Sequence, residues 1–438
     1  MKTITRFIGT MVASMALLGL LGFGMPSGHA AETAETNAGA IAALPGNAAT
    51  VDAHVHGDDG HAHAAGEGKN LLREIGLRYL TAYMFCLSIC VGALFLLFIH
   101  HLFDAAWSVP IRRVVEQIAA LLFPWMLVLL VPILVLQKHI YPWLSIDPAD
   151  DHSLEVKRVL FNTPTFNILL PLLVASWGWI AHTFRKWSIA QDTDGSPIWT
   201  RKARVLAAAG IFYFAFSLTL GCIYLMKSLQ HHFFSTMYGV YYFAGSVWTA
   251  LITVWVVTLW LKIKGPLSQV VHQRQIQDVG VWFFAFTIFY AYIHFSQYFL
   301  IWNAALPEET FWYVTREAGT WKWVGFTILF GHFFVPFLVL LNQDVKMNPA
   351  IMVPMCGWAW LMHYVDMTFN IMPTYEPLKM GPQVSFLDPL FWFGMLALLG
   401  FFFLRNFRSA APYPLRDPRL KEAITHHEIP APGAAAHH

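Results

Sequence analysis

Nine long apolar segments follow one another along most of this chain, and they restrict what it can fold into more than any other feature. They cover approximately residues 79–101, 115–137, 164–184, 205–227, 239–261, 279–302, 322–341, 350–371 and 387–404. A helix needs about 20 mainly apolar residues to cross the hydrocarbon core of a bilayer, and each segment has about that length. Only 12% of the residues are charged, roughly half the fraction that is usual in soluble domains. The sequence therefore predicts an all-α integral membrane protein.

A tenth apolar run lies at the N-terminus, after two basic residues. We expect residues 1–23 to form either a transmembrane helix or a signal peptide that is cleaved. Residues 24–75 are rich in Ala, Gly and His and carry few large apolar side chains, so they are predicted to form a loop outside the membrane. The membrane domain then spans residues 76–404, and residues 405–438 form a tail. With the first helix retained, the chain has about ten transmembrane helices.

The basic residues of the loops predict the orientation of the helices, because Lys and Arg accumulate on the cytoplasmic side of membrane proteins. With the N-terminus in the cytoplasm and ten crossings, 18 of the 28 Lys and Arg residues fall on the cytoplasmic side. We therefore predict that both termini are cytoplasmic. The histidine-rich loop and the acidic pair Glu308 and Glu309 then lie on the outer, periplasmic side.

The chain lacks the motifs of several classes of site. Its four cysteines all lie inside apolar segments, and none belongs to a CxxC or CxxCH motif, which argues against an attached c-type haem. It contains no glycine-rich phosphate loop, HExxH or GxSxG, so we expect neither a hydrolase nor a nucleotide-driven pump. We expect the chain to bind no metal, no redox cofactor of its own and no nucleic acid. A haem b held by two of His294, His332 and His363 stays open.

A few polar side chains interrupt the apolar segments, where a charge costs about 2.5–3.5 kcal/mol at the centre of a helix. These candidates are His294, Gln297 and Tyr298 on one helix face, His363, Asp366 and Asn370 on another, and His332 in the segment between them. Such side chains could bind a quinol head group, accept its protons and pass them along. Alternatively, they form hydrogen bonds that hold the helices together. The sharpest prediction is that His363 and Asp366 form a proton-handling pair that faces the interior.

Charged residues at the ends of the segments have less specific interpretations. Asp104, Arg112 and Arg113 follow the segment 79–101, and we favour an interfacial ion pair for Asp104 over a contact with another subunit. His231 and His232 precede another segment, where a helix cap or a contact with a partner is expected.

A short outer loop combines charged and aromatic residues. Glu308, Glu309 and Arg316 lie there among Phe, Trp and Tyr side chains. This composition suits the docking of a periplasmic partner, and it equally suits an aromatic belt at the membrane interface.

Four stretches of the sequence resemble one family of membrane proteins. They are HLFDAAWSVPIRRVVE (101–116), HHFFSTMYGVYYFAGS (231–246), FSQYFLIWNAALPEETFWYVTR (295–316) and GHFFVPF (331–337). Together they are similar to the F subunit of bacterial alternative complex III, a quinol:electron-acceptor oxidoreductase, which belongs to the polysulfide-reductase membrane-subunit (NrfD-like) family. The likeness covers roughly residues 75–404, and SQY-x-LIW-x-A-x-x-PEET-x-WY-x-x-R is its most specific part.

The resemblance implies a ten-helix protein of the bacterial cytoplasmic (inner) membrane, built around two four-helix bundles plus two further helices. It implies a paralogous membrane subunit and periplasmic iron–sulfur and c-haem subunits as partners, besides membrane lipid. The complex oxidises quinol and passes electrons to a cytochrome c or to a terminal oxidase, whereas the membrane subunits of this family carry no redox cofactor. Whether this subunit supplies a quinol site, a proton path or a scaffold stays open. The alternatives are the membrane anchor of a molybdopterin-type reductase and a stand-alone secondary transporter.

Overall fold

The structure of this chain, a computed structural model, describes residues 59–425 and within them contains helices and turns but no strand. The chain divides into two units at residue 70, and the helix bundles described below belong to the second, Leu71–His438. The predicted helix or signal peptide at residues 1–23 lies outside the described residues, as does most of the predicted loop.

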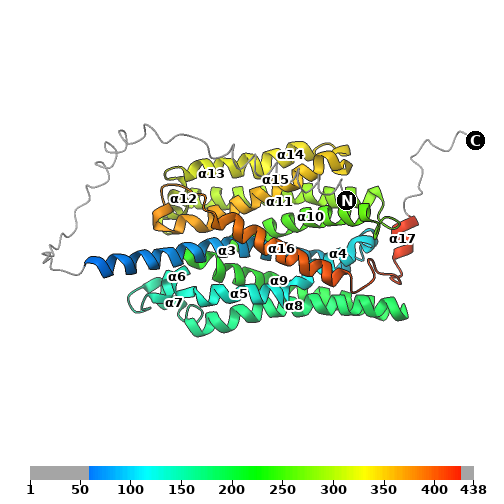
Figure 1. Ribbon diagram of the computed structural model, residues 1–438, viewed down its shortest axis with the longest axis horizontal. Helices are drawn as coiled ribbons and strands as arrows, with labels where there is room; N and C mark the ends of the chain where they lie inside the picture. Colours follow the sequence, from blue (N-terminus) through cyan, green and yellow to red (C-terminus); the bar gives the residue numbers. More distant parts are fainter. Residues whose placement is uncertain (1–58, 426–438) are drawn as a thin grey trace, which may run out of the picture. The chain divides into compact units, whose positions relative to one another are not determined.

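Each apolar segment of the described range forms one long helix or a series of helices that continue one another (Figure 1). The single helices are α3 (Asp59–Leu102), α8 (Thr163–Asp194), α9 (Ile198–Leu225), α10 (Tyr238–Lys264), α11 (Gln273–Ala304), α15 (Pro349–Ile371) and α16 (Leu387–Phe407). The first series is η1 (Ala106–Ser108), α4 (Val109–Ala119), η2 (Ala120–Leu122) and α5 (Trp125–Val135), and the second is α13 (Trp321–Thr327), η5 (Ile328–Phe334) and α14 (Val335–Leu340). The remaining short helices are α6 (Gln137–Ile140), η3 (Pro142–Ser145), α7 (His152–Lys157), η4 (Lys227–Gln230), α12 (Pro307–Glu317), η6 (Asp344–Met347), η7 (Met372–Thr374), η8 (Glu376–Leu378) and α17 (Leu420–Thr425).

Eight of these spans are long and apolar enough to cross a membrane, which confirms the predicted all-α membrane fold. The eighth predicted segment, 350–371, forms α15, which is not among these eight spans; His363, Asp366 and Asn370 interrupt its apolar run. Asn348 caps this helix by accepting a hydrogen bond from the N–H of Ala350. Its 23 residues extend about 34 Å along the helix axis, which is enough to cross a hydrocarbon core of about 30 Å.

The loop predicted at residues 24–75 is too long at its C-terminal end, because α3 begins at Asp59. The stretch from residue 59 to residue 75 contains Ala, Leu, Glu, Lys and Arg beside its Gly and His residues. These five residue types are strong helix formers, and they extend the helix beyond the apolar segment.

The helices of Leu71–His438 pack as two groups, one of three spans and one of four, whereas two bundles of four were predicted. In one group α8 packs against α9, α4, η2 and α5; in the other, α10 packs against α11 and α15, and η5 and α14 complete it (Figure 1). Contacts between α9 and α10 join the groups, and the apolar part of α3 is 94% buried among them. At Gly92, α3 comes so close to α10 that a Cβ would lie 2.2 Å from the carbonyl oxygen of Ser246.

The connections between spans alternate between two ends. We call the end that carries Asp104 and the α8–α9 connection the inner end. We call the end that carries His231 and α12 the outer end; both names are taken from the predicted orientation.

Candidate functional site

Three ionisable side chains from two spans meet in the buried interior, and we call them the central cluster. His363 and Asp366 lie on α15, whereas His332 lies on the π-helical segment η5. All three are fully buried, and their ligand atoms lie within 4.8 Å of one another. Packing of α15 against η5 thus brings together candidates from two separate sequence segments.

His363 is held between three helices. Its Nδ1 lies 4.0 Å from Oδ2 of Asp366, one turn away on α15, and its Nε2 lies 3.1 Å from the hydroxyl of Ser88 on α3. Gly245 on α10 leaves room for the ring, because a Cβ there would lie 2.9 Å from Cε1 of His363. Both side chains of the pair are buried, but 4.0 Å is too long for a hydrogen bond between them.

Asp366 is hydrogen-bonded through only one of its two oxygens. Its Oδ1 accepts hydrogen bonds from the hydroxyl of Tyr241 and, at 3.3 Å, from the side-chain amide of Asn370. The hydroxyl of Tyr241 also lies 3.2 Å from that of Tyr290. Oδ2 of Asp366 and Nδ1 of His363 have no hydrogen-bond partner among the described residues.

His332 is packed rather than hydrogen-bonded. Its ring is stacked between Trp248 and Tyr290, and its centroid is 3.9 Å from that of each neighbour. Neither ring nitrogen has a hydrogen-bond partner within the part of the chain that the structure describes. Most buried polar atoms have such a partner. Free atoms also occur at other buried side chains, such as both ring nitrogens of His101, and the central cluster differs in that three ionisable side chains with free atoms meet in one place.

The backbone around His332 departs from an α-helix, and one of its carbonyls has no backbone partner. In a π-helix the N–H of residue i+5 bonds to the carbonyl of residue i, but Pro336 has no N–H to offer to Gly331. The indole of Trp358 on α15 donates to the Gly331 carbonyl instead, at 2.8 Å. The π-helical segment is thereby fixed to α15, which places His332 beside His363.

Hydrogen bonds continue from the central cluster toward the outer end. Asn370 lies one turn beyond Asp366, and its amide donates to the hydroxyl of Tyr241 at 3.0 Å. Its Oδ1 accepts from the hydroxyl of Tyr238, the first residue of α10, at 3.0 Å. Asp366 is five residues from the end of α15, about 8 Å along the axis, so this network occupies the outer half of the span.

Arg316 closes the network at the outer end of α15. Its guanidinium donates to the carbonyls of Phe369 and Asn370, at 2.9 and 2.7 Å, and lies 3.5 Å from the ring centroid of Trp312. The last carbonyls of a helix lack partners within the helix, and a cation is favourable there. Burial lowers the pKa of Arg316 to about 9, so the side chain keeps its charge at neutral pH. Because Arg316 is buried, it does not face a partner as the docking interpretation requires.

Glu308 and Glu309 lie in the first turn of α12, where negative charge is favourable near the helix N-terminus. Glu308 is exposed and Glu309 is half-buried. Their contact with a partner stays a prediction.

The polar residues of α11 reach the central cluster only in part. The ring centroid of His294 lies 5.4 Å from that of Tyr241, and Gln297 is buried on the same face. Tyr298 points away, since it is exposed and its hydroxyl donates to Glu317 at 3.3 Å. Successive residues of a helix are about 100° apart, so a narrow buried stripe that includes Gln297 excludes its neighbour Tyr298.

Asp104, Arg112 and Arg113 form ion pairs at the inner end, as the interfacial interpretation predicts for Asp104. Each binds an oppositely charged side chain far away in the sequence. The pairs are Asp104 with Arg204 and Arg419, Arg112 with Asp417, and Arg113 with Asp192. Arg112 and Arg113 are buried, so they act within the chain.

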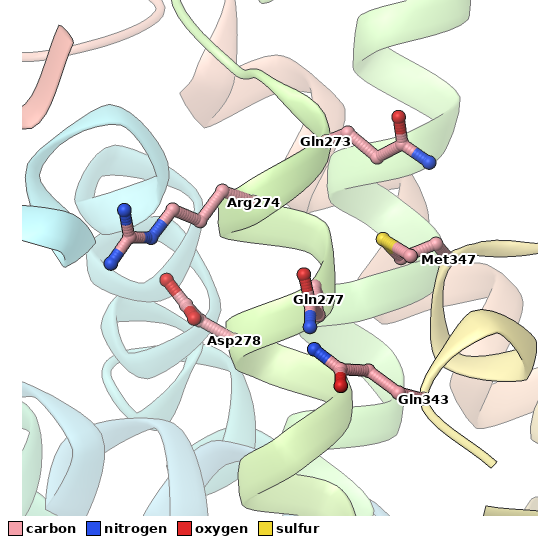
Figure 2. A pocket seen from close by; sticks show the side chains of 6 residues that line it. All are labelled: Gln273, Arg274, Gln277, Asp278, Gln343 and Met347. Atoms are coloured by element: carbon pink, nitrogen blue, oxygen red, sulfur yellow. The ribbon is translucent and has the colours of Figure 1, made fainter. Parts of the chain in front are cut away.

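An open hollow of about 570 Å³ also lies at the inner end. Figure 2 shows its lining: Gln273, Arg274, Gln277 and Asp278 from α11, with Gln343 and Met347 from the connection between α14 and α15. Arg274 and Asp278 lie on one side of α11 and Gln343 on the other. The hollow is at the opposite end from the outer network and does not belong to the central cluster.

The tyrosines that contact the central cluster were not predicted, because their positions in the sequence give an ambiguous signal. Tyr238 and Tyr241 are three residues apart at the start of α10, on one helix face, and Tyr290 meets them from α11. Tyrosines at the end of an apolar segment are also typical of the membrane interface. Ser88, a lone serine in an apolar helix, carries no signal.

The donors of the central cluster, two imidazoles and one carboxylate, are of the types that bind transition metals, and they are equally the types that exchange protons. No model of a known protein family matches the chain, and no curated protein is significantly similar to it. Inference about function therefore rests on the residues of the chain and their geometry.

Proposed function

We propose that this chain is a membrane subunit of a respiratory quinol-oxidising complex, and that its central cluster accepts and passes on protons released from quinol. Oxidation of quinol to quinone releases two electrons and two protons. The electrons pass to the iron–sulfur and c-haem groups of partner subunits, which assemble with this chain and a paralogous membrane subunit. The protons need side chains that ionise within the membrane. His332, His363 and Asp366 are such side chains. The resemblance of four stretches of the sequence to the membrane subunit of alternative complex III supports the assignment to a quinol-oxidising complex.

The observation that carries the proposal is the set of free polar atoms in the central cluster. Side chains that only hold helices together form hydrogen bonds across the helices. Both nitrogens of His332, Nδ1 of His363 and Oδ2 of Asp366 have no such bond to any described residue. Ionisable groups are costly inside a membrane and are typical of functional sites, so free atoms on three of them favour a chemical role.

A proton fits the central cluster better than a quinol head group does. Both faces of the His332 ring are covered, by Trp248 and Tyr290, and the three side chains lie within 4.8 Å of one another. A proton needs no cavity of its own. It can move along hydrogen-bonded hydroxyls and amides, and Tyr241 and Asn370 provide these toward the outer end.

One observation favours the alternative of a stand-alone secondary transporter. The π-helical segment η5 interrupts a span beside the central cluster, and transporters commonly bind ions where helices are interrupted near the midplane. Isolation of the chain from its own membrane separates the two proposals. A subunit brings iron–sulfur and c-haem polypeptides with it, whereas a transporter is isolated without them.

We expect Asp366→Asn to block proton movement without dismantling the complex. The amide keeps the shape of the carboxylate and still accepts the hydrogen bond from Tyr241, but it cannot ionise. In the complex reconstituted into vesicles, quinol-driven proton translocation should fall at least about tenfold. A pH-sensitive dye follows the protons, and subunit composition reports assembly.

Tyr242→Phe is the matched control, because it removes a buried hydrogen bond between α10 and α3, from the Tyr242 hydroxyl to the Met84 carbonyl at 2.8 Å, that lies outside the proposed path. If the cluster only joins helices, both variants weaken assembly to a similar extent and the assembled complexes translocate protons normally. Normal translocation by assembled Asp366→Asn at every pH tested overturns the proton path. Loss of quinol binding in that variant would overturn it too and would place the head group at the cluster.

A further inference from the structure

Three metal-ligating side chains outside the central cluster meet at the outer end. Asp151 directly precedes α7, and His231 and His232 lie between η4 and α10. Their ligand atoms lie within 4.8 Å of one another. Nε2 of His231 and Nε2 of His232 lie 2.7 and 3.3 Å from the same atom, Oδ2 of Asp151.

We propose that Asp151, His231 and His232 form a binding site for a divalent transition metal of the zinc type. Zinc sites that keep an open position use three such nitrogen and oxygen ligands and a water. With metal–ligand bonds of about 2.0–2.1 Å, neighbouring ligand atoms in a tetrahedral site lie about 3.3 Å apart. His232 and Asp151 already have this separation. The shorter contact of His231 is a hydrogen bond, and the metal replaces its hydrogen after a small outward shift of the ring.

The carboxylate is oriented independently of a metal. Oδ1 of Asp151 accepts hydrogen bonds from the N–H groups of Ser153 and Leu154, at 2.8 and 3.3 Å, which caps α7 and leaves Oδ2 for the histidines. Groups that fix a ligand in this way strengthen metal binding. The side chain of His231 is 9% exposed and that of His232 is 60% exposed. One imidazole is thus held in the packed structure, while the other gives access from solvent.

A positive charge beside the site restricts which cation it takes. The ammonium of Lys157 donates to the backbone carbonyl of His231 at 2.9 Å and to the hydroxyl of Ser153 at 3.1 Å. It repels every cation, and Ca²⁺ and Mg²⁺ have no compensating set of oxygen ligands here. A metal that bonds strongly to imidazole, such as Zn²⁺, gains enough from two histidines.

A bound metal would tie together two connections that are distant in the sequence. His231 lies 80 residues from Asp151, so no local spacing in the sequence indicates the site. The sequence predicted no metal and expected only a cap or a partner contact for the two histidines. The fold brings the three ligands together from two distant connections, so the structure indicates a metal site that the sequence did not.

Metal titration of the full chain tests the site. The purified protein is freed of metal with a chelator and titrated with Co²⁺, whose visible absorption reports four-coordinate binding, and Zn²⁺ is then measured by competition. Loss of a residue that only hydrogen-bonds to a metal ligand weakens metal binding about 10–100-fold. Loss of a ligand itself should cost at least as much, so we expect His232→Gln to bind Co²⁺ at least about tenfold more weakly. Ca²⁺ and Mg²⁺ should not compete.

His152→Gln is the matched control. This histidine is next to Asp151, and its side chain is 90% exposed. Its Nδ1 lies 3.9 Å from Oε2 of Glu155. It should bind Co²⁺ like the wild type, and His232→Cys should restore binding through a thiolate. Histidines in residues 54–63 and 426–438 are common to all the proteins, so binding to them cancels in the comparison. Equal binding by wild type and His232→Gln overturns the inference, as does an equal loss in His152→Gln.

Discussion

Single residues at the inner end show how buried charges stabilise this chain. Asp417 is 4% exposed and lies between Arg112 and Arg419, at 2.5 and 2.8 Å. Burial alone would raise the pKa of its carboxyl, but hydrogen bonding to Arg419 and the charges of both arginines hold that pKa well below its usual range. A pKa lower in the folded than in the unfolded chain stabilises the fold above the unfolded value of about 3.9. This stabilisation is lost as the pH falls through the folded value.

We expect Asp417→Asn to reduce the free energy of unfolding by about 3–5 kcal/mol, because it leaves Arg112 buried without its hydrogen-bonded counter-ion. Thermal unfolding of the purified chain in detergent at neutral pH measures the loss. The difference from wild type should shrink as the pH is lowered from about 4, because the unfolded wild-type chain then binds the proton first. Asp344→Asn, at an exposed position of the same end, is the control. Equal midpoints for the wild type and Asp417→Asn would contradict the prediction.

The sequence identifies the three residues of the central cluster, but it does not show which of their atoms are hydrogen-bonded. His332, His363 and Asp366 stand out because each is ionisable inside an apolar run. Which of their atoms are bonded depends on Tyr241 and on other side chains from distant helices. Arg316 was placed at the surface for the same reason: its partners are carbonyls of another helix, and no spacing in the sequence marks them.

At the scale of elements, the span from Trp321 to Leu340 shows the limit of pattern-based prediction. Its length and apolar character predict a membrane helix, and proline is tolerated in such helices when neighbours satisfy the freed carbonyl. The sequence does not say which neighbour does so. Here it is Trp358, 27 residues away on α15, bound to Gly331. This partner lies on another span, so no local pattern in the sequence marks it.

Trp358→Phe should destabilise the chain by about 1 kcal/mol, because the Gly331 carbonyl then lacks a donor inside the packed helices. Trp360→Phe on the same helix is the control. The indole of Trp360 donates to the hydroxyl of Thr253 at 3.2 Å, and that hydroxyl still donates to the Thr249 carbonyl afterwards. Thermal unfolding in detergent compares the two variants. The account of η5 is wrong if Trp360→Phe is the more destabilising one.

At the scale of the whole molecule, two ion pairs indicate that the chain crosses the membrane an even number of times between their partners. Arg112 with Asp417, and Asp104 with Arg419, join the region around residues 104–112 to the segment after α16. Side chains that bind each other lie on one side of the membrane, so an even number of crossings separates them. Seven of the eight apolar spans lie between, and α15 makes the eighth crossing. We therefore expect helix α15 to span the membrane despite its lower hydropathy.

Reporter fusions around α15 test this topology, and we expect the side to change twice along the last two spans. A fusion after Met347 should be cytoplasmic, one after Lys379 periplasmic and one after Arg408 cytoplasmic, because α15 and α16 each cross once. The excess of Lys and Arg on the inner end sets which side is cytoplasmic. Alkaline phosphatase is active only outside and green fluorescent protein fluoresces only inside, so each fusion point is read in both ways.

Cleavage of residues 1–23 would not alter the pattern, since it leaves residue 24 on the same side. Fusions after Met347 and Lys379 that report the same side would show that α15 does not cross, and the ion pairs at the inner end would then be impossible.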